Sequence, residues 1–257
     1  MNIGIVGCNG RVGKHLIKTI LSGDWDAKGI KLAGGSARKI NDIEGNFFKT
    51  ENEEELFERA DCIIDFTLPE GTITHAKLAQ KHKKPLIIGT TGLSAEDETV
   101  LKEAAQDTCI VYASNMSIGV NLLFALVEQT AAKLSSDWDI EIFESHHKYK
   151  VDAPSGTALS LGKAAATGRN NSLENLAEYD RHGTIGAREK GKIGFSVARG
   201  GDVIGDHTVF FLGESERLEL THKASDRSLF AKGALHAALW SQDKEPGLYS
   251  MRDVLEI

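Results

Sequence analysis

Short apolar runs alternate with longer amphipathic stretches through the first 115 residues. The runs have the length and β-branched content of strands, and they lie at residues 2–7, 30–34, 62–67, 86–90 and 110–113. Helical patterns separate them, for example at 12–21 and 95–106, and the Glu run at 53–55 fits a helix's first turn or a solvated face. Strands that alternate with helices are typical of βαβ units, so the pattern predicts a parallel sheet.

The pattern changes after Asn115. A helical pattern at 120–134 leads into an alternating strand at 138–146. Three runs of period two follow, IGFSVARGG, VIGDHTVFFLG and ERLELTHKAS, and their short connections predict antiparallel pairing. The last 30 residues return to a helix, LFAKGALHAALW, and end in a short tail. We therefore expect a dinucleotide-type α/β domain together with an α+β domain.

Composition and charge narrow the class of protein. The 257 residues carry 30 Lys and Arg against 37 Asp and Glu, so the net charge of -7 argues against a nucleic-acid or anionic-lipid partner. No apolar run approaches the ~20 residues that a membrane helix needs. Met1 leads almost directly into a strand, which leaves no room for a signal peptide. The three scattered cysteines lack disulfide or metal spacing, so we expect a cytoplasmic protein.

Three glycines follow the first predicted strand and open the first helix. Gly7, Gly10 and Gly13 have the spacing G-x-x-G-x-x-G, a variant of the dinucleotide fingerprint. Glycines let the backbone turn tightly and approach a pyrophosphate, which sits on the free N–H groups of the helix start. The alternative is a tight strand-to-helix turn without a ligand. The position between a strand and a helix favours a nucleotide site.

The end of the second strand indicates which nucleotide binds. NAD sites place an acidic residue there to hold the ribose hydroxyls, but KLAGGSARK at 31–39 contains none. Arg38 and Lys39 stand where a 2′-phosphate would lie, so charge favours NADP(H). The alternative is that both are solvated loop residues. Two further loops, GTTGL at 89–93 and ASNMSIG at 113–119, follow predicted strands and are either ligand loops or helix caps.

Residues 144–159, ESHHKYKVDAPSGTAL, gather positive potential before a predicted helix. His146 and His147 should point to opposite faces of the strand that they end. Gly156 and Thr157 would expose N–H groups at the start of a helix, which is an anion site. With Lys150 beside them, these residues predict a receptor for a small dicarboxylate and a titratable imidazole next to the reacting atom.

Structural roles are the alternative for this stretch. An isolated histidine on a strand is often a satisfied structural residue, Tyr149 is suited to packing, and Asp152 is suited to bracing the turn. No metal site is expected, because adjacent strand residues diverge and no third ligand has suitable spacing.

The sequence resembles the 4-hydroxy-tetrahydrodipicolinate reductase family, also called dihydrodipicolinate reductase. ESHHKYKVDAPSGTAL matches the family signature E-x-H-H-x-x-K-x-D-A-P-S-G-T-A. Further matches cover essentially the whole chain: GCNGRVG, IDFTLPEG, IGTTG, ASNMSIGVN, GDHTVFF, ERLELTHKAS and GLYSMRDVL. The resemblance implies a Rossmann-type parallel-sheet domain formed by residues 1–116 with 228–257. It also implies a central α+β domain, 117–227, whose open mixed or antiparallel sheet binds substrate and assembles a homotetramer.

The resemblance also implies roles for single residues. The pyrophosphate would be cradled by Gly7, Cys8, Asn9, Gly10, Arg11 and Val12. The nicotinamide side would be lined by Gly89, Thr90, Thr91, Ala113, Ser114, Asn115 and Met116. Arg38 matches the position associated with the 2′-phosphate, whereas Ala37 stands where the family often has a ribose-binding Glu. That departure favours NADPH, with NADH as a possible second cofactor.

For chemistry, the resemblance implies that His146 is the proton donor or acceptor and that Lys150 is a second acid. His147, Gly156 and Thr157 would hold the substrate carboxylates. The implied activity is reduction of 4-hydroxy-tetrahydrodipicolinate to tetrahydrodipicolinate in diaminopimelate and lysine biosynthesis. Two alternatives stay open: another NADP-dependent dehydrogenase of the aspartate pathway, and a non-catalytic NADPH sensor, which would need a basic recognition helix if it were a repressor.

Overall fold

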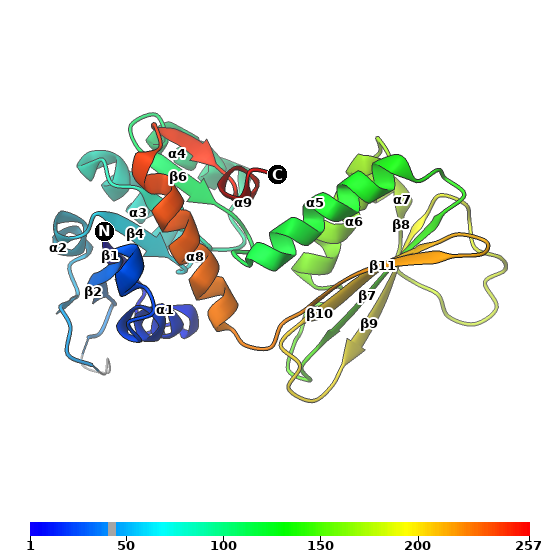
Figure 1. The fold of residues 1–257 in the computed structure, drawn as a ribbon, viewed down its shortest axis with the longest axis horizontal. Helices are drawn as coiled ribbons and strands as arrows, with labels where there is room; N and C mark the ends of the chain where they lie inside the picture. The colour runs from blue at the N-terminus through cyan, green and yellow to red at the C-terminus, as the bar shows by residue number, and fades with distance from the viewer. Residues whose placement is uncertain (41–44) are drawn as a thin grey trace. The chain divides into compact units, whose positions relative to one another are not determined.

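The computed structural model describes residues 1–40 and 45–257, which form two compact units (Figure 1). The first consists of Met1–Ile118 and Arg227–Glu256 and is here called the terminal unit, because it combines the N-terminal segment with the last helix of the chain. Gly119–Asp226 makes up the second, here called the central unit. Among the described residues, no helix is both long enough and apolar enough to cross a membrane.

A seven-stranded sheet, in which every neighbouring pair is parallel, forms the middle of the terminal unit. The strand order is β12-β6-β5-β4-β1-β2-β3. The strands are β1 Asn2–Val6, β2 Lys31–Ser36, β3 Lys49–Thr50, β4 Cys62–Asp65, β5 Leu86–Ile88, β6 Cys109–Tyr112 and β12 Gly247–Tyr249. The predicted Rossmann-type parallel sheet is therefore confirmed.

Helices cover both faces of this sheet and bury a separate core on each (Figure 1). Successive strand residues point to opposite faces, so Ile64 belongs to one core and Ile63 to the other. The first core is shared with α1 (Arg11–Leu21), α8 (Ser228–Trp240) and α9 (Met251–Leu255). The second is shared with α2 (Glu53–Arg59), α3 (Pro69–His82) and α4 (Ala95–Ala104).

The chain's end departs from the predicted short tail. Residues Gly247–Tyr249 add the parallel edge strand β12 beside β6, and helix α9 follows. Ser250 caps α9 in a reciprocal capping box with Asp253, and Met251 and Val254 are buried in the first core. A strand of three residues carries too little periodicity to be recognised, which is why the pattern did not predict it.

The central unit is a five-stranded mixed sheet with the order β11-β10-β7-β9-β8. Its strands are β7 Asp139–His146, β8 Ala177–Glu178, β9 Ile193–Arg199, β10 Asp206–Leu212 and β11 Arg217–Lys223. Helices α5 (Ile118–Lys133) and α6 (Gly156–Gly168) pack on one face of this sheet, and the short α7 (Leu173–Leu176) precedes β8 (Figure 1).

The predicted pairing of the three successive strands is partly wrong. β10 and β11 are antiparallel neighbours, as expected. β9 and β10, however, do not pair: β7 lies between them, parallel to β9 and antiparallel to β10. The chain between β7 and β9 contains the crossover helix α6, and such a crossover permits parallel pairing. The mixed sheet therefore places the end of β7 between the end of β9 and the start of β10.

Candidate active site

The glycine loop of the terminal unit has the geometry of a phosphate cradle. Gly7 has a φ of 66°, in the left-handed region, and its carbonyl accepts a hydrogen bond from the Gly10 amide at 2.9 Å. A Cβ at Gly13 would lie 2.6 Å from the Gly7 carbonyl oxygen, so a larger residue there would displace the loop. Gly10 caps α1 without a side-chain hydrogen bond, which leaves the first helical N–H groups for a ligand. The cradle fits a dinucleotide pyrophosphate.

A pocket of about 540 Å³ opens beside this cradle. The predicted cofactor residues Gly7, Asn9, Gly10 and Arg38 line it. Ala37 and Lys39, which flank Arg38 just after β2, line it as well. The remaining lining residues come from α2, from the loop after β4 and from α3, and are Glu53, Phe66, Thr67, Leu68, Gly71 and His75. The pocket thus combines the two cations Arg38 and Lys39 with apolar side chains, which suits a phosphorylated adenosine.

The other predicted cofactor residues lie close to the sheet. Residues 89–91 follow β5 and residues 113–116 follow β6, at the same edge of the parallel sheet as the glycine loop. The side chains of Cys8, Thr90 and Met116 are buried, so these three residues would contact a cofactor only through their backbone. Thr90 accepts a hydrogen bond from Thr72 at 2.8 Å. Arg11 and Thr91 are exposed; Val12, Gly89, Ala113, Ser114 and Asn115 are partly exposed or exposed.

One buried charge cluster beside the pocket was not predicted. His75 Nδ1 lies 2.8 Å from Asp65 Oδ2, and its Nε2 lies 3.0 Å from Glu53 Oε1. Burial disfavours the imidazolium, but hydrogen bonds and charges from Asp65 and Glu53 outweigh it and raise the pKa of His75 to about 9. The Glu run at 53–55 does fill the first turn of α2, as the sequence indicated, but its contact with a histidine 22 positions later has no sequence signal.

In the central unit, strand β7 carries a second histidine–carboxylate pair. Its buried positions alternate, so Glu144 and His146 share one face, and His146 Nδ1 lies 2.5 Å from Glu144 Oε2. Arg199 on β9 donates to both carboxylate oxygens, at 2.8 Å each. Burial lowers the pKa of His146, and the Glu144 contact only partly offsets this. His147, as expected, diverges: its side chain is more exposed and packs against Tyr149, with ring centroids 6.4 Å apart.

Lys150 lies in the loop after β7. Its Nζ contacts both carboxylate oxygens of Asp152 at 2.8 Å, so Asp152 orients the ammonium as well as bracing the turn. The amine, with a side chain about 20% exposed, remains within reach of a ligand. Lys150 also contributes to the lowered pKa values of His146 and His207, which places its charge beside both imidazoles.

Helix α6 begins where the sequence predicted. Ser155 is its N-cap and accepts a hydrogen bond from the Ala158 amide at 3.1 Å. Gly156 is exposed and is the first residue of the helix, so it lies where helical N–H groups have no partner within the helix. The Ser155 hydroxyl also lies 3.0 Å from Nε2 of His207 on β10, whose pKa burial lowers to about 4. The hydrogen bond between this hydroxyl and the neutral His207 holds the cap in place.

Sequence reasoning missed Glu144, Arg199 and His207 as members of this cluster. Glu144 is the first residue of the signature, so its position within the motif was the available signal. Arg199 and His207 reach the cluster only through the pairing of β9 and β10 with β7. Among residues 1–40 and 45–257, no group of three His, Cys, Asp or Glu side chains is placed to hold a metal ion.

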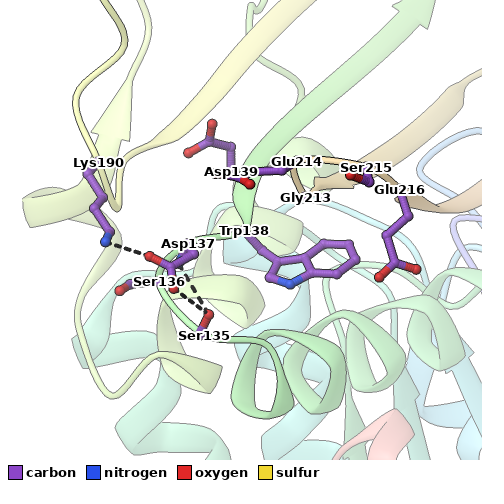
Figure 2. A pocket seen from close by; sticks show the side chains of 10 residues that line it. All are labelled: Ser135, Ser136, Asp137, Trp138, Asp139, Lys190, Gly213, Glu214, Ser215 and Glu216. Atoms are coloured by element: carbon purple, nitrogen blue, oxygen red, sulfur yellow. Dashed lines mark hydrogen bonds and ion pairs between the residues drawn. The ribbon is translucent and has the colours of Figure 1, made fainter.

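A larger hollow, of about 780 Å³, lies at the start of β7 (Figure 2). It surrounds Trp138 and contains four carboxylates, Asp137, Asp139, Glu214 and Glu216. Lys190 pairs with Asp137 at 2.6 Å. The hollow is lined by none of the predicted site residues, and its acidic character does not suit a dicarboxylate, so size alone does not identify the active site.

Two matching family descriptions span the chain. Residues 1–116 match "Dihydrodipicolinate reductase, N-terminus" and residues 119–255 match "Dihydrodipicolinate reductase, C-terminus". The chain is 50% identical to a 4-hydroxy-tetrahydrodipicolinate reductase of Rhizobium rhizogenes, covering 99% of this chain and 96% of that protein. It is 47% identical to one of Dinoroseobacter shibae, covering 98% and 96%.

Solved structures agree on the fold. A dipicolinate-bound dihydrodipicolinate reductase from Paenisporosarcina sp. TG-14 has a TM-score of 0.80 at 22% identity, covering 97% of both chains. A DAP dehydrogenase of C. glutamicum has a TM-score of 0.56 at 13% identity, covering 100% of this chain and 93% of that one. The family descriptions and the sequence identities settle the assignment: the chain belongs to the dihydrodipicolinate reductase family of NAD(P)H-dependent oxidoreductases.

Proposed function

We propose that the protein reduces 4-hydroxy-tetrahydrodipicolinate to tetrahydrodipicolinate, using NADPH, in diaminopimelate and lysine biosynthesis. Its relatives at 45–50% identity carry the name of this activity. The observation that supports it best in this chain is the cluster of His146, Lys150 and the start of helix α6. It joins a titratable imidazole, an ammonium and the start of a helix within one unit.

The substrate's two carboxylates need compensating positive charge. The start of α6 supplies roughly 0.3–1 kcal/mol for a surface anion. Charge-assisted hydrogen bonds contribute about 1.5–3 kcal/mol each, so Lys150 and His147 would provide most of the attraction. In this proposal Gly156 and Thr157 donate their amides to one carboxylate. The dipicolinate bound to the structural relative is a dicarboxylate of the same kind.

His146 and Lys150 manage the protons of the reaction. A bound dihydronicotinamide supplies the hydride, which adds to the conjugated imine that remains after the substrate loses water. Negative charge then develops on the neighbouring ring atoms, and His146, which has first taken up a proton from solvent at Nε2, neutralises it by donating that proton. Lys150 holds a positive charge beside the same atoms and is the second acid. The products are tetrahydrodipicolinate, water and the oxidised nucleotide, so electrons and protons balance.

Arg38 and Lys39 support NADPH as the preferred cofactor. Both line the pocket beside the glycine cradle, and Ala37 offers no carboxylate to a free ribose 2′-hydroxyl. Substituting Arg38 by Ala should lower kcat/KM for NADPH by tenfold or more, roughly the value of one charge-assisted contact, and change that for NADH little. Equal losses with both cofactors would contradict a role at the 2′-phosphate.

Assembly and location remain predictions from the sequence. Phe143 on β7 is 39% exposed and lies on the sheet face opposite to the buried Ile140 and Ile142. We propose that this sheet forms the contacts of a homotetramer, which multi-angle light scattering would detect. A cytoplasmic location is part of the same proposal.

The activity test uses NADPH oxidation with freshly condensed pyruvate and aspartate semialdehyde, compared with the semialdehyde alone. Oxidation only with the condensed product supports the reductase, whereas oxidation with the semialdehyde alone supports another dehydrogenase of the aspartate pathway. No oxidation with either would favour a non-catalytic sensor. Lys150→Ala should reduce kcat by about 100-fold or more while NADPH affinity is kept. Lys148→Ala, two residues earlier in the same loop, is the matched control and should stay near wild type.

A further inference from the structure

Glu144 is a fully buried carboxylate whose hydrogen-bonding capacity is used on every side. Oε2 contacts His146 Nδ1 at 2.5 Å and Arg199 Nη1 at 2.8 Å. Oε1 accepts from Arg199 Nη2 at 2.8 Å and from the Ser155 amide at 2.9 Å. Burial alone would raise the pKa of the Glu144 carboxyl, but these donors outweigh it and lower the pKa. The carboxylate is therefore ionised at neutral pH and can only accept hydrogen bonds.

An ionised Glu144 determines which ring nitrogen of His146 carries the proton. Since the carboxylate only accepts, Nδ1 must donate to it, and a neutral His146 then has its lone pair on Nε2. Position 205 keeps that nitrogen uncovered, because a Cβ there would lie only 2.9 Å from Nε2. Nδ1 of His146 therefore points toward Glu144, and Nε2 is the nitrogen that can exchange a proton.

Arg199 connects this pair to the rest of the site. Its guanidinium forms the bidentate contact with Glu144, and Nη2 also donates to the Asp152 carbonyl at 2.7 Å. Asp152 in turn holds Lys150 through its carboxylate. An isolated carboxylate would stabilise the imidazolium strongly, but Arg199 already neutralises Glu144. The guanidinium therefore weakens the attraction of Glu144 for a protonated His146 and makes that proton easier to release.

We propose that Glu144 and Arg199 are positioning residues for His146: Glu144 fixes the tautomer with the proton on Nδ1, and Arg199 limits how firmly His146 holds a second proton. This inference rests on the proposed function, in which His146 donates the proton that completes the reduction. Neither residue touches the substrate in this scheme, and both act through the imidazole.

Other charges around His146 also bear on its titration. His207 on β10 makes an edge-on contact, with ring centroids 5.1 Å apart, and is neutral near pH 7 because burial lowers its pKa to about 4. Lys150 adds positive charge from the loop, partly balanced by Asp152. These groups are unchanged in variants at positions 144 and 199, so such variants isolate the two positioning residues.

The test is the pH dependence of kcat and of kcat/KM for two variants that act in opposite directions. Glu144→Gln removes the negative charge, so the limb assigned to His146 should move to lower pH, with kcat reduced by roughly 10- to 100-fold. Arg199→Gln exposes His146 to the full charge of Glu144, so the same limb should move to higher pH. Arg181→Gln is the matched control, because Arg181 forms a comparable pair with Glu141 on the other face of β7. Its profile should not move.

Opposite shifts support the proposal, whereas unchanged limbs or shifts in the same direction overturn it. A purely structural role would lower kcat in both variants without moving either limb. If a variant fails to fold, ¹⁵N NMR of the wild-type imidazoles still decides the matter, because a neutral His146 protonated on Nε2 would refute the inference. These outcomes are separate from failure of the proposed function, which would appear as an inactive wild-type protein with the correct tautomer.

Discussion

The two units of this protein each bury a histidine against a carboxylate, but with opposite consequences. In the terminal unit, His75 Nδ1 lies 2.8 Å from the fully buried Asp65. In the central unit, His146 Nδ1 lies 2.5 Å from the fully buried Glu144. The pKa of His75 is raised to about 9, whereas that of His146 is lowered. The same pair of side chains therefore favours the imidazolium in one unit and the neutral imidazole in the other.

The third charged group accounts for the difference. His75 meets a second carboxylate, Glu53, at its other nitrogen. His146 instead has the positive charges of Lys150 and Arg199 nearby, which lower its pKa, and Arg199 also pairs with Glu144. Burial opposes the imidazolium in both units, so the balance of nearby charge decides the result. A histidine–carboxylate contact alone consequently does not identify a catalytic acid.

Removing Asp65 should have the largest effect on stability. Asp65→Asn leaves a buried His75 with only the partly exposed Glu53, and breaking such a buried pair costs about 3–5 kcal/mol. Urea unfolding at pH 7 would measure the loss. Glu54→Gln is the control, because Glu54 pairs with His82 and Lys81 at the surface and should matter little. Equal losses in the two variants would show that the Asp65–His75 pair has no special weight.

The two histidine environments should also give opposite pH dependences of stability. His75 has a raised pKa, so its contribution is complete below pH 6.5 and is lost as the pH rises through about 9. His207 has a lowered pKa, so the contribution of its neutral form to stability is complete above pH 6.5. This contribution is lost as the pH falls through about 4. Each histidine should change the free energy of unfolding by roughly 3 kcal/mol across its pH window, because one pKa unit corresponds to about 1.4 kcal/mol. Hydrogen exchange of α3 and of β10 would follow the two units separately.

Single variants provide the control for these windows. His75→Gln should flatten the alkaline side of the profile and leave the acid side unchanged, and His207→Gln should do the reverse. If stability were still lost at alkaline pH in His75→Gln, that loss would have to come from the titration of a different group.

The sequence predicted the framework of both sites but not these charge balances. Gly7 and Gly10 are three residues apart in sequence, and the cradle follows from a local strand–glycine–helix pattern. Glu144 and His146 are two residues apart on one strand, so their shared face was readable from its alternation. Arg199 lies 55 residues after Glu144, and it reaches Glu144 only because β9 pairs with β7.

The same limit explains the incorrect strand pairing. Short turns between β9, β10 and β11 favoured consecutive antiparallel neighbours, which holds for β10 and β11. The position of β7 between β9 and β10 depends instead on α6 and on the core that it shares with Ile140 and Phe195. The local sequence pattern predicts helices and strands well. The protonation states of the histidines in the central sheet depend instead on contacts between strands that are distant in sequence.

The smallest expected effect comes from Glu53, and it tests the explanation most directly. Glu53→Gln removes the second carboxylate from His75 but leaves Asp65 in place. The Glu53 side chain is 38% exposed, so solvent screens the pair and the loss of stability at pH 7 should be about 1 kcal/mol or less. The pKa of His75, followed by NMR, should fall below about 9 by an amount that matches this loss, at about 1.4 kcal/mol per pKa unit. If it stayed near 9, Asp65 alone would suffice to hold the proton. Neutralisation of Glu144 by Arg199 would then have to explain the whole contrast between the two units.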